Sequence, residues 1–145
     1  ALACDVLIAS ENARFADTHA RVGILPGWGL SQKLSRLIGI YRAKELSLTG
    51  NFIGAEQAAE WGLVNRVVPH GELLPTCRQL ATDMLSVVPE CLPAYKALID
   101  EGFGQSFGEG LKTEARVSGE ANTKVSSSAI EERREGIRQR GKSQA

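Results

Sequence analysis

The amino-acid sequence predicts an α/β segment over residues 1–68, followed by an all-helical segment over residues 69–145. Two observations carry this prediction. In the first segment, short apolar runs of strand length alternate with runs of helical period, which is typical of a sheet covered on both faces. After Pro69, every apolar pattern has helical period. The 145 residues make about one domain's length, and an apolar fraction of 43% supports a core.

The α/β segment is expected to place its strands between helices. In chain order, the expected elements are the last turn of a helix (1–5), a buried strand (6–9), a short extended piece (14–16), three helices (29–39, 43–48 and 54–61) and a last strand (63–68). The first of the three helices is the clearest, because Leu30, Leu34, Leu37 and Ile38 recur at helical spacing. Lys33 is expected on the opposite side of this helix, with Gln32 and Arg36. Glycines end these helices, and Pro69 closes the last strand.

The second segment predicts four helices, over residues 72–87, 89–104, 106–125 and 129–139. Pro89 is expected in the first turn of the second of these, where a missing N–H costs little. That helix is expected to bury Leu92, Tyr95, Leu98 and Ile99. In the last helix only Ile130 and Ile137 are expected to face inward, and so polar a helix is expected to pack on another surface or subunit.

Charge and composition narrow the function classes. The formal net charge is zero and neither half is polarised, so there is no electrostatic case for nucleic acid or an anionic membrane. No apolar run reaches the roughly 18 residues of a membrane span. Cys4, Cys77 and Cys91 are odd in number and lack metal-ligand spacing, which predicts buried thiols in a reducing intracellular compartment. Peroxisome, mitochondrion and cytoplasm all fit.

The stretch from Asp17 to Gly29 carries the candidate site. It sets His19, one of two histidines, ahead of an apolar run and a loop in which Pro26 and Gly27 permit close approach to a ligand. His19 is either a structural hydrogen-bonding residue or a group that exchanges protons near neutral pH. Trp28 is either a lid over an apolar cavity or a plug packed against the sheet.

Other candidate sites are weaker. His19 and His70 have no partner at ligand spacing, so no metal is expected. No cysteine lies in an electropositive setting, which argues against a Cys–His nucleophile. Arg14 and Arg21 are either solvated surface residues or contacts for an anionic ligand.

Several short motifs follow one another along nearly the whole chain. They are Ala3-Cys4-Asp5-Val6-Leu7-Ile8-Ala9, Ala13-Arg14-Phe15-Ala16, Val22-Gly23-Ile24-Leu25-Pro26-Gly27 with Gly29, Gln32-Lys33-Leu34, Leu37-Ile38-Gly39, Leu48-Thr49-Gly50, Ala55-Glu56-Gln57-Ala58 and Gly62-Leu63-Val64-Asn65-Arg66-Val67-Val68. In this order the chain resembles the enoyl-CoA hydratase/isomerase (crotonase) superfamily.

The resemblance implies a crotonase-like ββα spiral, of which residues 1–68 are the C-terminal part. It implies that residues 69–145 are a helical region through which such proteins form homotrimers or homohexamers. The implied substrate is an acyl-CoA thioester, with no further cofactor. Two backbone N–H groups hold the thioester oxygen in this family, and in hydratases two glutamates bracket a water. The expected activity is enoyl-CoA hydratase of fatty-acid β-oxidation, with isomerase, acyl-CoA hydrolase or an inactive oligomeric member as alternatives.

The resemblance also implies roles for single residues. The oxyanion-hole amides and the first glutamate are expected upstream of Ala1, so the fragment alone is expected to be inactive. His19 occupies the position of the second glutamate and is the expected catalytic residue. Thr18, Pro26, Gly27 and Trp28 are expected to line the acyl side, where Trp28 narrows the pocket. The usual aromatic and Glu-Lys-Arg ending of the family is absent at the C-terminus.

Overall fold

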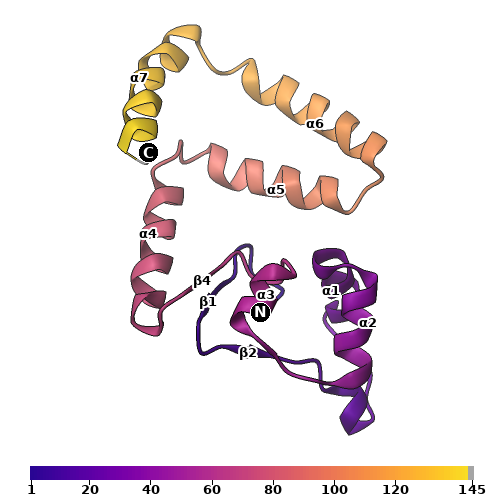
Figure 1. Cartoon of the computed structure of the whole chain (residues 1–145). Helices are drawn as coiled ribbons and strands as arrows, with labels where there is room; N and C mark the ends of the chain where they lie inside the picture. The colour runs from indigo at the N-terminus through magenta and orange to yellow at the C-terminus, as the bar shows by residue number, and fades with distance from the viewer. Residues whose placement is uncertain (144–145) are drawn as a thin grey trace. The chain divides into compact units, whose positions relative to one another are not determined.

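The architecture comes from a computed structural model, which describes residues 1–143. In chain order its elements are β1 (Ile8–Ser10), β2 (Arg14–Phe15), the 3₁₀ helix η1 (His19–Val22), α1 (Leu30–Ile38), α2 (Ile40–Thr49), β3 (Ile53–Gly54), α3 (Ala55–Glu60), β4 (Arg66–Val68), the 3₁₀ helix η2 (His70–Glu72), α4 (Leu73–Leu85), α5 (Cys91–Phe103), α6 (Phe107–Asn122) and α7 (Ser127–Ser143) (Figure 1). The chain divides into two compact units between Asp83 and Met84, and each is described by itself.

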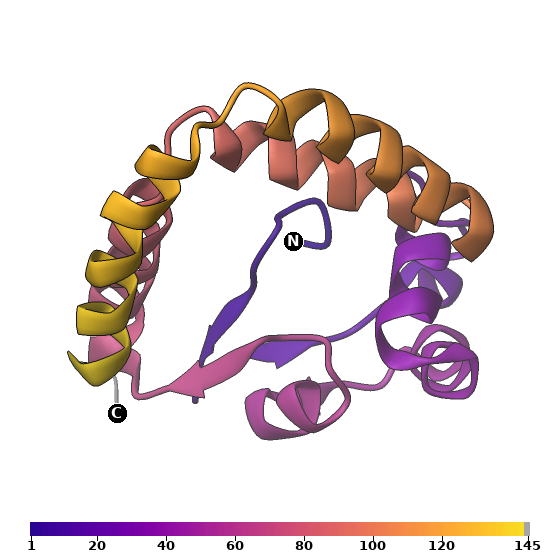
Figure 2. The same ribbon diagram turned by 90° about the horizontal axis from the view of Figure 1, so that it is seen from above.

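Two small sheets form the strand layer of the first unit. β1 pairs in parallel with β4 (Figure 2), and β2 pairs antiparallel with β3. In the parallel pair, Ile8 lies opposite Arg66. A parallel pair needs a long crossover, which here contains α1, α2 and α3. Two hydrogen bonds join Asn65, which precedes β4, to Leu7, which precedes β1. The Asn65 side-chain oxygen accepts the Leu7 N–H at 2.9 Å, and the Asn65 backbone N–H donates to the Leu7 carbonyl at 2.7 Å.

The hydrophobic core lies in the first unit. α1 and α2 run side by side there and are joined at Gly39, whose φ of 82° is unfavourable for other residues (Figure 1). The apolar faces of the helices meet the strands, and the buried apolar residues are Ala9, Leu34, Ile38, Ala43, Leu46, Ile53, Ala55, Ala58, Leu63 and Val64. The helical spacing in α1 therefore predicted the buried positions Leu34 and Ile38 correctly, but Leu37, on the same expected face, is exposed.

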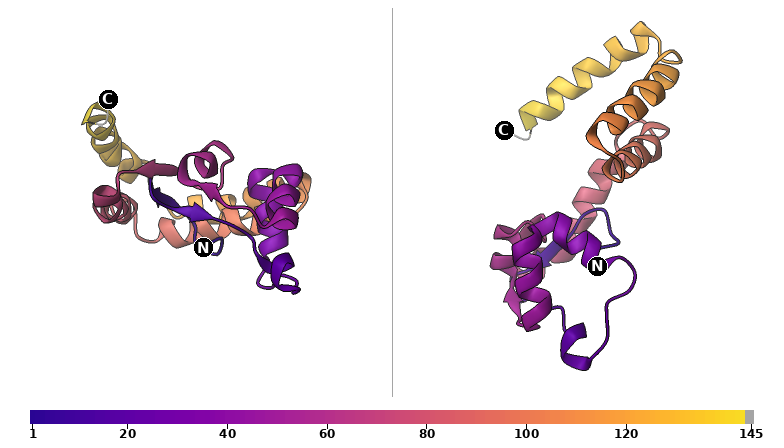
Figure 3. Two further views of the ribbon diagram at one scale, coloured as in Figure 1. Left: turned by 60° about the horizontal axis from the view of Figure 1, so that its bottom comes forward. Right: turned by 90° about the vertical axis from the view of Figure 1, so that its right-hand side faces the viewer.

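The second unit contains a helical hairpin of α5 and α6, which lie side by side (Figure 3). Their backbones come close at one point, because a Cβ on Gly110 would lie 3.4 Å from the carbonyl oxygen of Gly102. Ser106 caps α6 by accepting the Glu109 N–H. Of the described residues from Met84 onward, none is buried.

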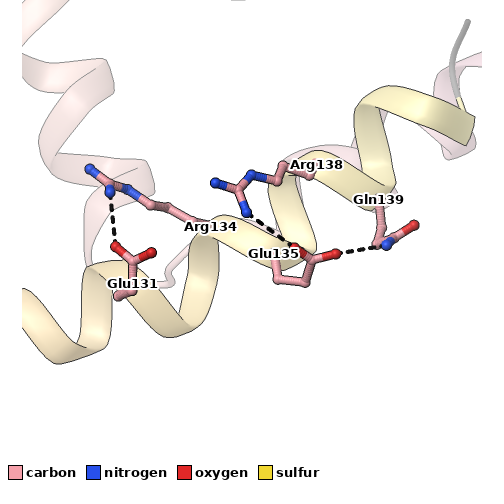
Figure 4. Close-up of polar contacts among 5 residues, drawn as sticks. All are labelled: Glu131, Arg134, Glu135, Arg138 and Gln139. Atoms are coloured by element: carbon pink, nitrogen blue, oxygen red, sulfur yellow. Dashed lines mark hydrogen bonds and ion pairs between the residues drawn. The ribbon is translucent and has the colours of Figure 1, made fainter.

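In the last helix, α7, charged and polar side chains on neighbouring turns contact one another (Figure 4). Glu131 pairs with Arg134 at 2.8 Å, and Glu135 contacts both Arg138 and Gln139. Such exposed pairs contribute only about 0.2–0.5 kcal/mol each. The expectation that Ile130 and Ile137 face inward is wrong for the described chain, since both are exposed.

Several expected elements differ from the structure. Residues 1–5 form a turn, closed by the Cys4 N–H on the Ala1 carbonyl, and not the end of a helix. A single closed turn supplies one backbone hydrogen bond, which is too little to offset the cost of helix nucleation. α5 begins at Cys91 and not at Pro89, because residues 89–90 form a turn instead. The pattern also missed η1, η2 and β3, which are too short to show a period.

Burial was also overestimated on α5 and at two of the cysteines. Leu92, Tyr95 and Ile99 of α5 are exposed, and only Leu98 of the expected set is half-buried. Cys4 and Cys91 are exposed free thiols, so the expectation of buried cysteines is wrong for them. Pattern analysis identifies an apolar helix face, but it does not identify what covers that face.

The change from strands and helices to helices alone follows β4, near residue 69 as expected. The two compact units instead divide within α4. A domain boundary near residue 69 therefore stays a prediction. Among residues 1–143, no helix combines the length and apolarity that crossing a membrane requires.

Candidate functional site

A cavity of about 720 Å³ opens in the first unit. Its wall is mostly apolar, with Asp17, His19, Arg14 and Lys33 as its charged or titratable members. The other lining residues come from the N-terminal turn, β2, the loop before α1, and the helices: Ala1, Leu2, Ala3, Leu7, Phe15, Ala16, Ile24, Leu25, Gly27, Trp28, Leu30, Leu34, Leu46 and Leu63. An apolar pocket with a few polar groups is the usual form of a small-molecule site.

Asp17 and His19 form a close pair at this wall. The Nδ1 atom of His19 lies 2.7 Å from Oδ1 of Asp17, and the His19 backbone N–H donates to the same oxygen at 3.2 Å. The Asp17 side chain is 5% exposed and that of His19 is 35% exposed. Ser47, on α2, also stabilises the charged form of the Asp17 carboxylate. The two-residue spacing is an Asx turn, in which an aspartate bonds the backbone two positions later.

The surroundings of Asp17 favour its charged form. Burial raises the pKa of this carboxyl, but hydrogen bonds from Ser47 and from the His19 side chain and backbone outweigh it, so that the pKa lies below its ordinary value. At neutral pH Asp17 is therefore a carboxylate, which can only accept hydrogen bonds.

This lowered pKa has a consequence for stability at acid pH. A carboxyl whose pKa is lower in the folded than in the unfolded state stabilises the fold above its unfolded pKa of about 3.9, and loses that contribution as pH falls through the folded value. We expect Asp17→Asn to lower the free energy of unfolding more at pH 6 than at pH 3. Urea unfolding of both proteins at the two pH values measures this difference. An equal loss at both pH values would contradict the assigned shift.

The structure brings some of the expected site residues together and separates others. His19, Gly27 and Trp28 line the large cavity. Thr18 lines a second hollow of about 510 Å³ with Arg14, Arg21, Gly50, Asn51 and Phe52. Pro26 lines neither of these two cavities. The roles of these residues toward a substrate stay predictions.

Trp28 adopts a backbone conformation that is unusual for its type. Its φ of 54° lies in the left-handed region, and it is followed by Gly29 with a φ of 82°. A residue other than glycine in this region costs about 1–3 kcal/mol. The Trp28 side chain is fully exposed, so the interpretation of a plug packed against the sheet is wrong. A role as a lid stays a prediction.

Two arginines at the smaller hollow have partners on the α2–β3 connection. The Arg14 guanidinium lies over the Phe52 ring, 5.1 Å from its centroid, and Arg21 Nη2 donates to Asn51 Oδ1 at 3.5 Å. Among residues 1–143, no group of three or more His, Cys, Asp or Glu side chains could hold a metal ion.

Sequence reasoning missed Lys33 and Ser47. Lys33 was expected opposite the apolar face of α1, but its side chain lies at the cavity wall and its stem runs beside Gly29. Its position three residues after Leu30 and one before Leu34 was the available signal. No local signal connects Ser47 with Asp17, because they lie 30 residues apart and meet only when α2 folds against η1.

An α/β unit with an apolar cavity and a carboxylate–imidazole pair at its wall has the form of a small-molecule binding site. Comparison with known proteins identifies the class. The family described as enoyl-CoA hydratase/isomerase matches residues 1–139. The chain belongs to this family, and its fold is the α/β crotonase-like fold with small sheets followed by helices.

Individual proteins of this family are similar to the chain in sequence and in structure. The protein "Probable enoyl-CoA hydratase 1, peroxisomal" of Arabidopsis thaliana is 46% identical over 79% of this chain and 43% of its own length. The crystal structure of enoyl-CoA hydratase from Bacillus anthracis matches with a TM-score of 0.77 and 40% identity, over 80% of this chain and 45% of that one.

A Thermobifida fusca YX protein assigned to the enoyl-CoA hydratases, crystallised in complex with CoA, matches with a TM-score of 0.79 and 29% identity over 85% of this chain and 48% of that one. The chain thus spans about half the length of the relatives it matches.

Proposed function

We propose that the full-length protein that contains this chain is an enoyl-CoA hydratase of fatty-acid β-oxidation. The observation that carries the proposal is the position of His19, whose imidazole lies at the wall of an apolar cavity and at the place where the family resemblance expects the second glutamate. The hydratase names of the relatives and the CoA bound to the Thermobifida protein support a thioester substrate.

The reaction adds water across the double bond next to a thioester. The water oxygen bonds to Cβ and loses a proton to a base, while Cα gains a proton from an acid. His19 carries one of these two transfers, because an imidazole holds or releases a proton near neutral pH. The apolar wall formed by Phe15, Leu34 and Leu46 accommodates the acyl chain. Gly27 and Trp28 border the acyl chain, Pro26 precedes them on the same loop, and Thr18 lies just before η1.

The remaining groups of the family mechanism belong to the part that this chain does not contain. In this proposal, residues 1–68 are the C-terminal part of the spiral core, and the oxyanion-hole amides and first glutamate precede them. The chain spans about half of each relative's length, which supports only the proposal that the whole protein is longer. The chain alone is then inactive.

Hydration of crotonyl-CoA by the full-length protein tests the proposal. We expect the absorbance of the conjugated enoyl thioester to fall and 3-hydroxybutyryl-CoA to accumulate. If crotonyl-CoA is unchanged while a 3-enoyl-CoA gains conjugation, the protein is an isomerase, an activity that the family description includes. Release of free CoA thiol identifies a hydrolase. The absence of all three reactions identifies an inactive oligomeric member and contradicts an enzymatic role.

The helical region from residue 69 onward is proposed to assemble the protein into trimers or hexamers. Large apolar side chains on its helices support this, since Tyr95, Phe103, Phe107 and Ile137 are all exposed within the described chain. Sedimentation of the full-length protein measures the assembly state, and a monomer at micromolar concentration would contradict the proposal.

A further inference from the structure

The contact between Asp17 and His19 assigns the proton on the imidazole. A distance of 2.7 Å from Nδ1 to Oδ1 is that of a charge-assisted hydrogen bond. A carboxylate has no proton to donate, so the proton between them belongs to Nδ1. In a neutral imidazole only one nitrogen carries a proton, and the hydrogen bond at one nitrogen determines the state of the other.

We infer that Asp17 is a positioning residue for His19, which holds the imidazole in the tautomer protonated at Nδ1 and leaves Nε2 as the nitrogen that exchanges a proton with the substrate. Within residues 1–143 no hydrogen bond to Nε2 is present. The inference rests on the proposed function for the identity of the substrate, but the tautomer itself is a property of the protein.

Asp17 is itself held in place, which a positioning role requires. Its side chain is 5% exposed and receives one hydrogen bond besides that of the imidazole, from the His19 backbone N–H. That bond fixes the turn between Asp17 and His19, and Ser47 stabilises the charged carboxylate from α2. The carboxylate therefore approaches the ring from a fixed direction.

The other charged groups at the cavity do not replace Asp17 in this role. Arg14 and Lys33 line the same wall, but both are cations without an acceptor for the Nδ1 proton. The second histidine offers a contrast. His70 Nδ1 lies 3.2 Å from the Ser10 hydroxyl, which can donate or accept, so this contact does not select a tautomer.

The test uses nitrogen NMR of the full-length protein labelled with ¹⁵N at histidine. The His19 signals are assigned by their loss in His19→Gln and are read at a pH where the ring is neutral. We expect a protonated, pyrrole-type signal for Nδ1 and an unprotonated, pyridine-type signal for Nε2. The reverse pattern in the unaltered protein overturns the inference, whatever the variants do.

Two variants extend the test. Asp17→Ala removes the acceptor, and we expect loss of the Nδ1-protonated signature at His19 while the His70 signals stay unchanged. Retention of the signature in a folded Asp17→Ala protein overturns the inference. If that variant does not fold, Ser47→Ala loosens the carboxylate and is expected to leave a mixture of the two tautomers. An unaltered single tautomer there contradicts the anchoring by Ser47.

These outcomes are independent of the hydratase assay. A protein that does not hydrate crotonyl-CoA but shows the Nδ1-protonated tautomer refutes the proposed function and retains the positioning role. A protein that hydrates crotonyl-CoA with His19 protonated at Nε2 supports the proposed function and refutes the positioning role of Asp17.

Discussion

Replacement of His19 by alanine is expected to lower kcat for crotonyl-CoA hydration roughly 10²- to 10⁴-fold, the usual contribution of a general acid or base. The methyl group of alanine cannot carry the proton that Cα gains or that water loses. Because His19 lies on a 3₁₀ helix at the wall of the cavity and is 35% exposed, its removal leaves the core intact. The measurement is steady-state hydration by the full-length protein, with the melting temperature of each variant recorded alongside.

The matched control is the other histidine. His70 lies on η2 and contacts Ser10 rather than the cavity, so His70→Ala is expected to leave kcat unchanged. A second variant, His19→Glu, supplies the carboxylate that the family resemblance expects and is predicted to retain more activity than His19→Ala. An unchanged rate in His19→Ala means that His19 has no catalytic role.

The order of the elements could be predicted from the sequence because it depends on local periodicity. The spacing of Leu30, Leu34, Leu37 and Ile38 defined α1 and, except for the exposed Leu37, the face that it turns to the core. Gly39 and Gly50 marked the ends of α1 and α2. These signals are contained within a few residues. The motifs from Ala3 to Val68 were sufficient for the family, which the comparisons confirm.

The candidate site was predicted only in part, because its contacts are not periodic. Asp17 was not among the expected catalytic or binding residues, yet it bonds the ring of His19 directly through a short turn. Ser47 reaches Asp17 from another helix, and Lys33 reaches the cavity through its long flexible stem. Such contacts depend on how elements pack and on side-chain length, neither of which a hydrophobic pattern encodes.

Replacement of Leu34 by alanine is expected to lower the free energy of unfolding by about 2–3 kcal/mol, the lower half of the range for buried leucines. Leu34 is 2% exposed and packs within the core, but it also lines the large cavity. The deleted methyl groups already border open space on one side. The loss in free energy of unfolding therefore consists mainly of the transfer free energy of those groups. The new void is small and adds little to that loss.

The control for this prediction is Leu37→Ala on the same helix. Leu37 is 46% exposed, so the same chemical change there is expected to cost less than about 1 kcal/mol. Urea unfolding measures the free energy of unfolding of the two variants, and the comparison holds when that free energy depends equally on urea concentration in both. Because both variants replace leucine by alanine on α1, helix propensity is equal and the difference reports burial alone. Equal losses would mean that Leu34 is not a core residue. A loss near 5 kcal/mol at Leu34 would mean that its surroundings are closely packed, and that the cavity beside His19 is narrower than the structure describes.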